Sequence, residues 1–415
     1  MDQGAASVLS GFLIAGSISV LIWAWWRSLQ PTYRKASESA FLTFTSTKYF
    51  SGLDALRAIS VLAVIWTHVT GPHHVHFLNQ GNRGVDLFFA ISGFLITTLL
   101  LREHRQTGRI SLSNFYIRRT LRIFPLYYAV LALYCILVYF TLRGTPKGAE
   151  FWHNLPAFAT YTTNWFVSAE RAGDYGVTFY FSWSLAAEEQ FYLFWPPLLM
   201  LVLWQGAKNW APAFSVLFIL GFQLATQTQG SADIVRAVFA SIAPAILWGV
   251  LFGVFLNDQR TFCAFWAFLG NKLVAPATLV LLLAMLQLEP NRFLTNSIMG
   301  LLVATVCIQE NTFLHPVLKW RPAIFIGTIS YGIYLMHMLA ANVVRKFVGH
   351  SFGIDVFVGT TLLVVVLAYL SYRFFESPIL RLSRRLSIQQ NPPHDGSAQG
   401  STQAPIEPKN LSVNK

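Results

Sequence analysis

The chain of 415 residues has little charge and very little cysteine. Asp, Glu, Lys and Arg make up 12% of it, about half of the roughly 25% that is usual in soluble domains, whereas hydrophobic residues make up 54%. This composition argues against a soluble enzyme, a disordered protein or a coiled coil. The three cysteines, Cys135, Cys263 and Cys307, lie within apolar runs. They therefore indicate small core residues rather than disulfides, a zinc site or a redox motif.

Apolar runs long enough to cross a bilayer recur along the chain. A spanning helix needs about 20 mostly apolar residues, and about eleven segments approach that length. The sequence therefore predicts an all-α integral membrane protein, a bundle of about 10–11 transmembrane helices. The segments lie at about 8–26, 57–72, 84–101, 123–141, 183–203, 211–227, 234–256, 273–288, 293–309, 323–344 and 355–374.

The first apolar run is interpreted as a retained anchor rather than a signal peptide. No Lys or Arg precedes Arg27, and no small-residue cleavage site follows the run, so the pattern of a secretory signal is missing. Three tryptophans close the run and would form an interfacial belt, as membrane helices often have. They are Trp23, Trp25 and Trp26.

The formal net charge of +12 indicates orientation in the membrane rather than an affinity for nucleic acid. With an outside N-terminus, the predicted cytoplasmic segments hold 22 of the 30 Lys and Arg residues, which fits the positive-inside rule. The C-terminus is then cytoplasmic, and the polar tail cannot bury enough apolar surface to fold. The expected divisions are an anchor with a cytoplasmic linker (1–49), a membrane domain (50–386) and a disordered tail (387–415).

Ionisable residues inside a span are functional candidates, since a charge at the bilayer centre is costly. Arg57 and His68 are eleven residues apart, which places them on one helix face and about 16 Å apart along the axis. Asp54 shares this face and is expected to pair with Arg57. A deep histidine can remove a proton from a hydroxyl, and an arginine at the cytoplasmic mouth can bind a phosphate. The alternative is a histidine satisfied by a neighbouring helix and an arginine that extends to the interface.

Two more pairs of charged residues are candidates. Arg119 and Arg122 share a helix face and suit a polyanion such as a phosphorylated nucleotide, although any cytoplasmic loop collects arginines. Glu188 and Glu189 follow Ser184 near a predicted helix start, where carboxylates are favoured. Because adjacent residues point to different faces, at least one carboxylate is expected inside the bundle, where it could orient a histidine or bind sugar hydroxyls.

Three further groupings permit two interpretations each. The first is a cluster of outer histidines, His73, His74 and His76. No carboxylate or cysteine stands at ligand spacing beside them, so we expect no metal. Tyr331, Tyr334 and His337 form a polar stripe, which either lines a cavity or bonds between helices. The outer loop at 142–180 suits sugar rings or an interfacial aromatic belt; its aromatic residues include Trp152, Tyr161, Trp165 and Tyr175.

Taken together, these segments resemble the acyltransferase-3 family of polytopic membrane acyltransferases. Each motif alone is weak, but the set stands in the family's order over about residues 50–380. The matching motifs are GLDALRA at 52–58 with His68, GVDLFFAISGF at 84–94, RRTLRIFP at 118–125, WSLAAEEQFY at 183–192, ISYGIYLMH at 329–337 and YRFFESP at 372–378. The family core has ten spans, so the resemblance makes 8–26 an added anchor.

The resemblance implies transfer of an acyl group, usually acetyl from cytoplasmic acetyl-CoA, to a hydroxyl of a surface or exported carbohydrate, including lipid-linked glycans. It also implies a multi-pass protein of the bacterial inner membrane and no metal. The family's essential Arg and His correspond to Arg57 and His68, and its cytoplasmic Arg-x-x-Arg motif corresponds to Arg119 and Arg122.

In the expected mechanism, the phosphates of acyl-CoA bind to Arg57, Arg119 and Arg122. His68 then either removes the acceptor's hydroxyl proton or first takes the acyl group itself. Glu188 and Glu189 are expected to orient the acceptor. The oxyanion donor stays open among backbone N–H groups, Ser92 and a tyrosine. The remaining candidates for substrate binding or structural support are Asp54, Asp86, Ser92, Tyr331 and His337.

The rival hypothesis is a proton-coupled transporter or flippase of a glycolipid, with His68 as a proton relay. Many transporters contain inverted repeats, and the sequence has no clear internal repeat. The acceptor's identity and the oligomeric state do not follow from the sequence.

Overall fold

Every regular element in the described part of the chain is a helix. The expected all-α fold class is therefore confirmed. The computed structural model describes residues 31–167, 177–204, 211–226, 242–288, 291–309 and 311–382. The expected anchor at 8–26 and the tail at 387–415 lie outside these ranges, as does the first part of the segment at 234–256.

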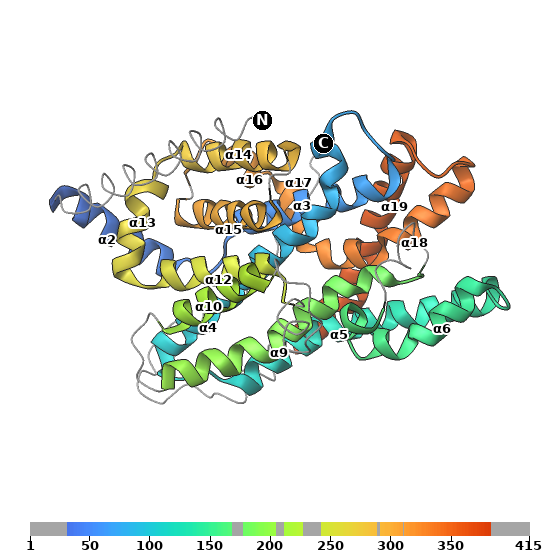
Figure 1. Cartoon of the computed structure of the whole chain (residues 1–415), viewed down its shortest axis with the longest axis horizontal. Coiled ribbons are helices and arrows are strands. Elements are labelled where there is room, and N and C mark those ends of the chain that lie inside the picture. The colour runs from blue at the N-terminus through green and yellow to red at the C-terminus, as the bar shows by residue number, and fades with distance from the viewer. Residues whose placement is uncertain are drawn as a thin grey trace, which may run out of the picture.

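The helices of the first part of the chain run from α2 to η3. α2 and α6 mark opposite ends of the molecule in Figure 1. The elements are α2 (Pro31–Ser46), α3 (Ser51–Val69), the 3-10 helix η1 (His76–Arg83), α4 (Gly84–Thr107), α5 (Leu112–Thr141), α6 (Pro146–Ala159), α7 (Thr163–Phe166) and the 3-10 helix η3 (Tyr180–Ser182).

The second group completes the bundle and ends in a π-helical turn, η4. The elements are α9 (Trp183–Trp204), α10 (Ala211–Thr226), α12 (Pro244–Asn257), α13 (Gln259–Leu269), α14 (Val274–Leu288), α15 (Arg292–Ile308), α16 (His315–Leu318), α17 (Arg321–Thr328), α18 (Ser330–Val348), α19 (Ile354–Ser371) and η4 (Tyr372–Glu376).

Within the described ranges, four helical stretches are long and apolar enough to cross a bilayer. They are Ser51–Val69, His76–Thr107, Leu112–Thr141 and Ile354–Leu382. Two bent pairs raise the number to six: α13 with α14 at 78°, and α17 with α18 at 76°. The helices α12 and α15 are apolar but shorter. Helices of this length and composition support an integral membrane protein.

Glycines bring the central helices into backbone contact. Gly93 of α4 and Gly249 of α12 each lie against the other helix's backbone, so that a Cβ at either position would meet a carbonyl oxygen. Gly327 of α17 lies in the same way against the backbone of Asp54 in α3. Small residues allow this close approach between membrane helices. The helix α3, which carries Arg57 and His68, is thereby held against a rigid support.

The segment at 142–180 differs from the expected loop, because α6 and α7 occupy much of it. Some of its aromatic side chains are buried in one cluster with Tyr127 and Tyr134 of α5. Trp152 and Trp165 are instead 41% and 45% exposed, and Tyr175 lies outside the described residues. The fully or almost fully buried members are Phe151, Phe158 and Phe179. Burial of these large rings stabilises helical structure here, and the segment becomes a wall of the bundle.

Candidate active site

The N-terminal end of α3 carries the expected ion pair. Arg57 Nη1 donates to Asp54 Oδ1 at 2.8 Å, and the Tyr49 hydroxyl donates to the other carboxylate oxygen. Burial, followed by the bond to Asp54, raises the pKa of Tyr49 above its ordinary value. A guanidinium has five N–H donors, and no second hydrogen-bond acceptor for Arg57 occurs among the described residues. Its remaining donors are therefore available to a ligand.

Arg119 and Arg122 of α5 face the same space as Arg57. The Arg119 guanidinium lies over the ring of Tyr192, 5.2 Å from the ring centroid. Arg122 interacts electrostatically with Arg119, Arg57 and Glu376 of η4, and its side chain is exposed. Three guanidinium groups from two helices therefore converge, beside the carboxyl groups of Asp54, Glu376 and Glu189. Guanidinium forks gathered in this way suit an anionic ligand.

Glu188 is held by side chains rather than by the start of its own helix. It accepts hydrogen bonds from Ser92 of α4 and from the Tyr192 hydroxyl, one turn further along α9. The Tyr192 hydroxyl also lies 3.2 Å from Ser92 Oγ. The structure therefore brings the predicted Ser92 and Glu188 together. The sequence analysis missed Tyr192, although its spacing of four residues from Glu188 is the usual signal of a shared helix face.

Glu189 faces a different set of side chains. It interacts electrostatically with Tyr127, Tyr128, Tyr161 and Tyr331. Adjacent carboxylates thus point apart, as expected, but both contact other helices. The sequence analysis also missed Tyr127 and Tyr128, whose position just after the arginine motif was a usable signal.

His68 and His337 come together at the C-terminal end of α3. Their ring centroids are 5.0 Å apart. His68 Nδ1 bonds the carbonyl of Val64 at 2.7 Å, and His337 Nδ1 bonds that of Tyr334. Because a carbonyl only accepts, each Nδ1 carries the proton and each neutral ring keeps its lone pair on Nε2. His337 is fully buried, and its Nε2 has no partner in the described structure.

Two residues of α18 connect this region to other helices. Tyr331 donates to the carbonyl of Ile123 in α5 at 2.8 Å, and Tyr334 lies 2.6 Å from Ser184 Oγ in α9. The polar stripe predicted on this helix therefore bonds between helices through these two tyrosines.

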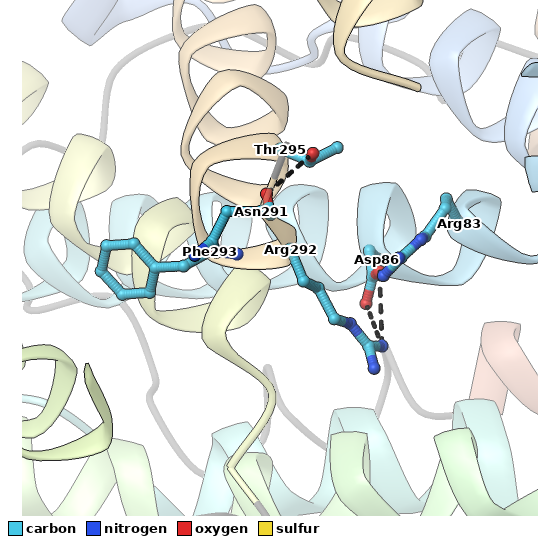
Figure 2. Close-up of polar contacts among 6 residues, drawn as sticks. All are labelled: Arg83, Asp86, Asn291, Arg292, Phe293 and Thr295. Atoms are coloured by element: carbon cyan, nitrogen blue, oxygen red, sulfur yellow. Dashed lines mark hydrogen bonds and ion pairs between the residues drawn. The ribbon is translucent and has the colours of Figure 1, made fainter. Parts of the chain in front are cut away.

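Asp86 lies apart from these groups, at the start of α4. It is 2% exposed and is bridged by Arg83 at 3.5 Å and Arg292 at 3.3 Å, as Figure 2 shows. Arg292 begins α15, where the Asn291 side chain accepts a hydrogen bond from the Phe293 backbone N–H at 2.7 Å. These contacts link α4 to α15. The structure does not bring Asp86 together with Glu188 or the histidines.

His73 and His76, two of the three clustered histidines, each have a partner of their own. His73 stacks on Trp66 with ring centroids 4.9 Å apart and lies 2.8 Å from Thr70 Oγ1. His76 lies 3.2 Å from the Gln80 amide. In the part of the chain that the structure describes, no three His, Cys, Asp or Glu side chains gather as metal ligands would.

Comparison with known proteins gives one family. Residues 50–373 match a family described as an acyltransferase domain. A Staphylococcus aureus (strain COL) protein, provisionally named an O-acetyltransferase, is 30% identical over 361 residues, covering 81% of this chain and 58% of the relative. The O-acetyltransferase OatA of Staphylococcus aureus (strain NCTC 8325) is 28% identical over 357 residues, covering 80% and 58%. The chain thus spans little more than half the length of these relatives. No solved structure gives a significant match.

Proposed function

The chain belongs to the acyltransferase family that it matches over residues 50–373, and from this we propose that it transfers an acetyl group from acetyl-CoA to a hydroxyl of a surface or exported carbohydrate. The observation that carries the proposal is the convergence of Arg57, Arg119 and Arg122 at one end of α3, with the imidazole of His68 at the other. The names of the relatives support acetyl as the acyl group. The proposal places the protein in the bacterial inner membrane with a cytoplasmic C-terminus.

The arginines bind the phosphates of the donor. A guanidinium fork matches phosphate oxygens in pairs, and among the described residues these three groups interact with the carboxyl groups of Asp54, Glu376 and Glu189. Asp54 holds Arg57 in place by its ion pair. The acyl-bearing arm of the donor then extends along α3 towards His68, over the distance of about 16 Å that eleven helical residues span.

His68 supplies the chemistry. Its Nδ1 proton is held by the Val64 carbonyl, which leaves Nε2 as a base. Nε2 takes the acceptor's hydroxyl proton as the oxygen attacks the thioester carbonyl. The carbon–sulfur bond then breaks, and the leaving sulfur of CoA takes the proton from Nε2, which restores the neutral imidazole. Such a base contributes about 10²–10⁴-fold. A second route, in which His68 Nε2 first carries the acyl group, uses the same geometry. Glu188, fixed by Ser92 and Tyr192, orients the acceptor.

The test is His68→Asn, because the amide keeps a donor for the Val64 carbonyl and removes the base. We expect transfer from [¹⁴C]acetyl-CoA to glycan to fall by about 10²–10⁴-fold. The matched control is His350→Asn, an exposed histidine paired with Asp355, which should keep normal transfer. Near-normal transfer by His68→Asn would refute the role of His68. Absence of transfer by purified wild-type protein, with glycolipid movement instead, would favour the transporter hypothesis.

A further inference from the structure

Hydrogen bonds from α5 and α9 hold the turn between α6 and α7 in place. The Tyr127 hydroxyl donates to the carbonyl of Phe158 at 2.7 Å, and Gln190 Nε2 donates to that of Tyr161 at 2.9 Å. Gln190 also exchanges two side-chain hydrogen bonds with Asn164, at 2.9 and 3.0 Å. Four hydrogen bonds therefore fix the backbone around Tyr161, directly beside the site residue Glu189.

Tyr161 is held in a conformation that its own chemistry disfavours. Its φ of 54° lies in the left-handed region, which bulky side chains rarely adopt. Its ring is stacked against Tyr127 and Phe124, with centroid distances of 4.2 and 5.3 Å. The side chain is 6% exposed, and the hydroxyl has no hydrogen-bond partner among the described residues. Both features cost free energy, as is common where a side chain is positioned for a ligand.

A carboxyl group lies near this hydroxyl. Glu189 comes just before Gln190 in the sequence, which bonds the Tyr161 carbonyl, and it interacts electrostatically with Tyr161 and with Arg119. No hydrogen bond to Glu189 occurs within the described ranges. Burial raises the pKa of the Tyr161 phenol above its ordinary value, so the phenol keeps its proton. A hydrogen-bond donor thus has a hydrogen-bond acceptor in its neighbourhood. This pair complements a hydroxyl group, which donates one hydrogen bond and accepts others.

The neighbouring surface suits a ring with an apolar face. Tyr128 stands edge-on to Tyr161, with centroids 6.2 Å apart, and it is 40% exposed. Its hydroxyl is bonded to the Ala159 carbonyl at 2.9 Å, which fixes the ring. Polar groups beside a rigid aromatic surface match the hydroxyls and the C–H face of a pyranose.

We propose that Tyr161 and Glu189 bind a hydroxyl of the acceptor sugar that does not react, the phenol donating to its oxygen and the carboxylate accepting its hydrogen. The pair thereby selects a polyhydroxylated ring and holds it while His68 acts on a different hydroxyl. This inference rests on the proposed acyl transfer. The turn between α6 and α7, which the sequence leaves between sugar binding and an interfacial belt, becomes part of the acceptor subsite.

The test compares Tyr161→Phe, which keeps the ring stack and removes only the hydroxyl, with Tyr139→Phe, an exposed tyrosine of α5. Purified full-length protein in lipid nanodiscs is assayed with [¹⁴C]acetyl-CoA and a panel of p-nitrophenyl pyranosides, and the best acceptor is kept. Loss of one hydrogen bond should raise the acceptor KM about tenfold, with the acetyl-CoA KM unchanged. Glu189→Gln should shift the acceptor KM in the same direction, and Tyr139→Phe should match the wild type.

The outcomes separate this inference from the proposed function. An unchanged acceptor KM in Tyr161→Phe, or an equal rise in both KM values, overturns the subsite while leaving acyl transfer intact. If the wild-type protein acetylates no pyranoside and no extracted glycan, the proposed function fails, and the inference falls with it.

Discussion

The two ends of α3 satisfy their polar groups in different ways. At the Arg57 end, full charges meet: Asp54 holds Arg57, and Arg122 and Arg119 add two guanidinium groups beside Glu376 and Glu189. At the His68 end, neutral rings are oriented by backbone carbonyls, and His337 lies beside His68. The first end is suited to hold an anion and the second to move a proton. Each variant below should affect one end without the other.

The largest separation should come from the arginine end. Arg119→Gln combined with Arg122→Gln removes two charge-assisted bonds of about 1.5–3 kcal/mol each, so the acetyl-CoA KM should rise by about 10²–10⁴-fold. The kcat should change little, because binding shared by ground state and transition state affects KM alone. Steady-state assays with [¹⁴C]acetyl-CoA measure both constants. Arg143→Gln, just beyond the C-terminal end of α5, is the control. An unchanged acetyl-CoA KM in the double variant would place the phosphates elsewhere.

The histidine end should give the opposite pattern. His337→Asn keeps a donor for the Tyr334 carbonyl and removes the buried Nε2 beside His68. We expect kcat to fall about tenfold, less than the 10²–10⁴-fold expected at the base itself, with the acetyl-CoA KM unchanged. The same assay reports both values. A rise in KM at constant kcat would mean that the two ends are not separate.

A smaller effect on kcat is expected from the hydrogen bond that holds the C-terminal end of α3. Arg345 Nη2 donates to the His68 carbonyl at 2.6 Å. Arg345→Gln loosens this last turn and should lower kcat about threefold to fivefold, since small misplacements of a catalytic group reduce rate. Arg345→Lys should recover part of the loss through its ammonium group. Equal activity in all three proteins would show that the bond does not position His68.

The smallest effect concerns the stability of the protein and comes from the N-terminal end of α3. Tyr49→Phe removes one hydrogen bond to Asp54, while the ion pair with Arg57 remains. The free energy of unfolding should fall by about 1 kcal/mol, seen as a lower thermal midpoint in detergent. Both KM values should match the wild type. A marked rise in the acetyl-CoA KM would assign Tyr49 to donor binding instead.

Features that depend on nearby residues followed from the sequence. The pairing of Asp54 with Arg57 follows from their spacing of three on a helix, and the structure contains it. The common face of Arg119 and Arg122 follows in the same way. The all-α fold follows from the long apolar runs, which leave a helix as the structure that satisfies its own backbone in lipid.

Features that depend on residues far apart in the chain did not follow from the sequence. Asp86 meets Arg292 across 206 positions, and no local pattern specifies that partner. The contact between His68 and His337 likewise needs the packing of α3 against α18. The position of Tyr161 depends on an unusual φ imposed by hydrogen bonds from two other helices, which neither composition nor periodicity encodes.

The contacts of α18 with three other helices have a consequence for how the two substrates bind. It contacts α5 through Tyr331, next to Arg122, and α9 through Tyr334, and it reaches α3 through His337 and Arg345. One rigid element therefore spans the donor-binding end and the reaction centre. A donor that shifts α5 shifts α18 as well, so the two substrates are expected to strengthen each other's binding. By thermodynamic linkage this synergy is reciprocal, so the acceptor should tighten the binding of acetyl-CoA by the same factor by which acetyl-CoA tightens the binding of the acceptor.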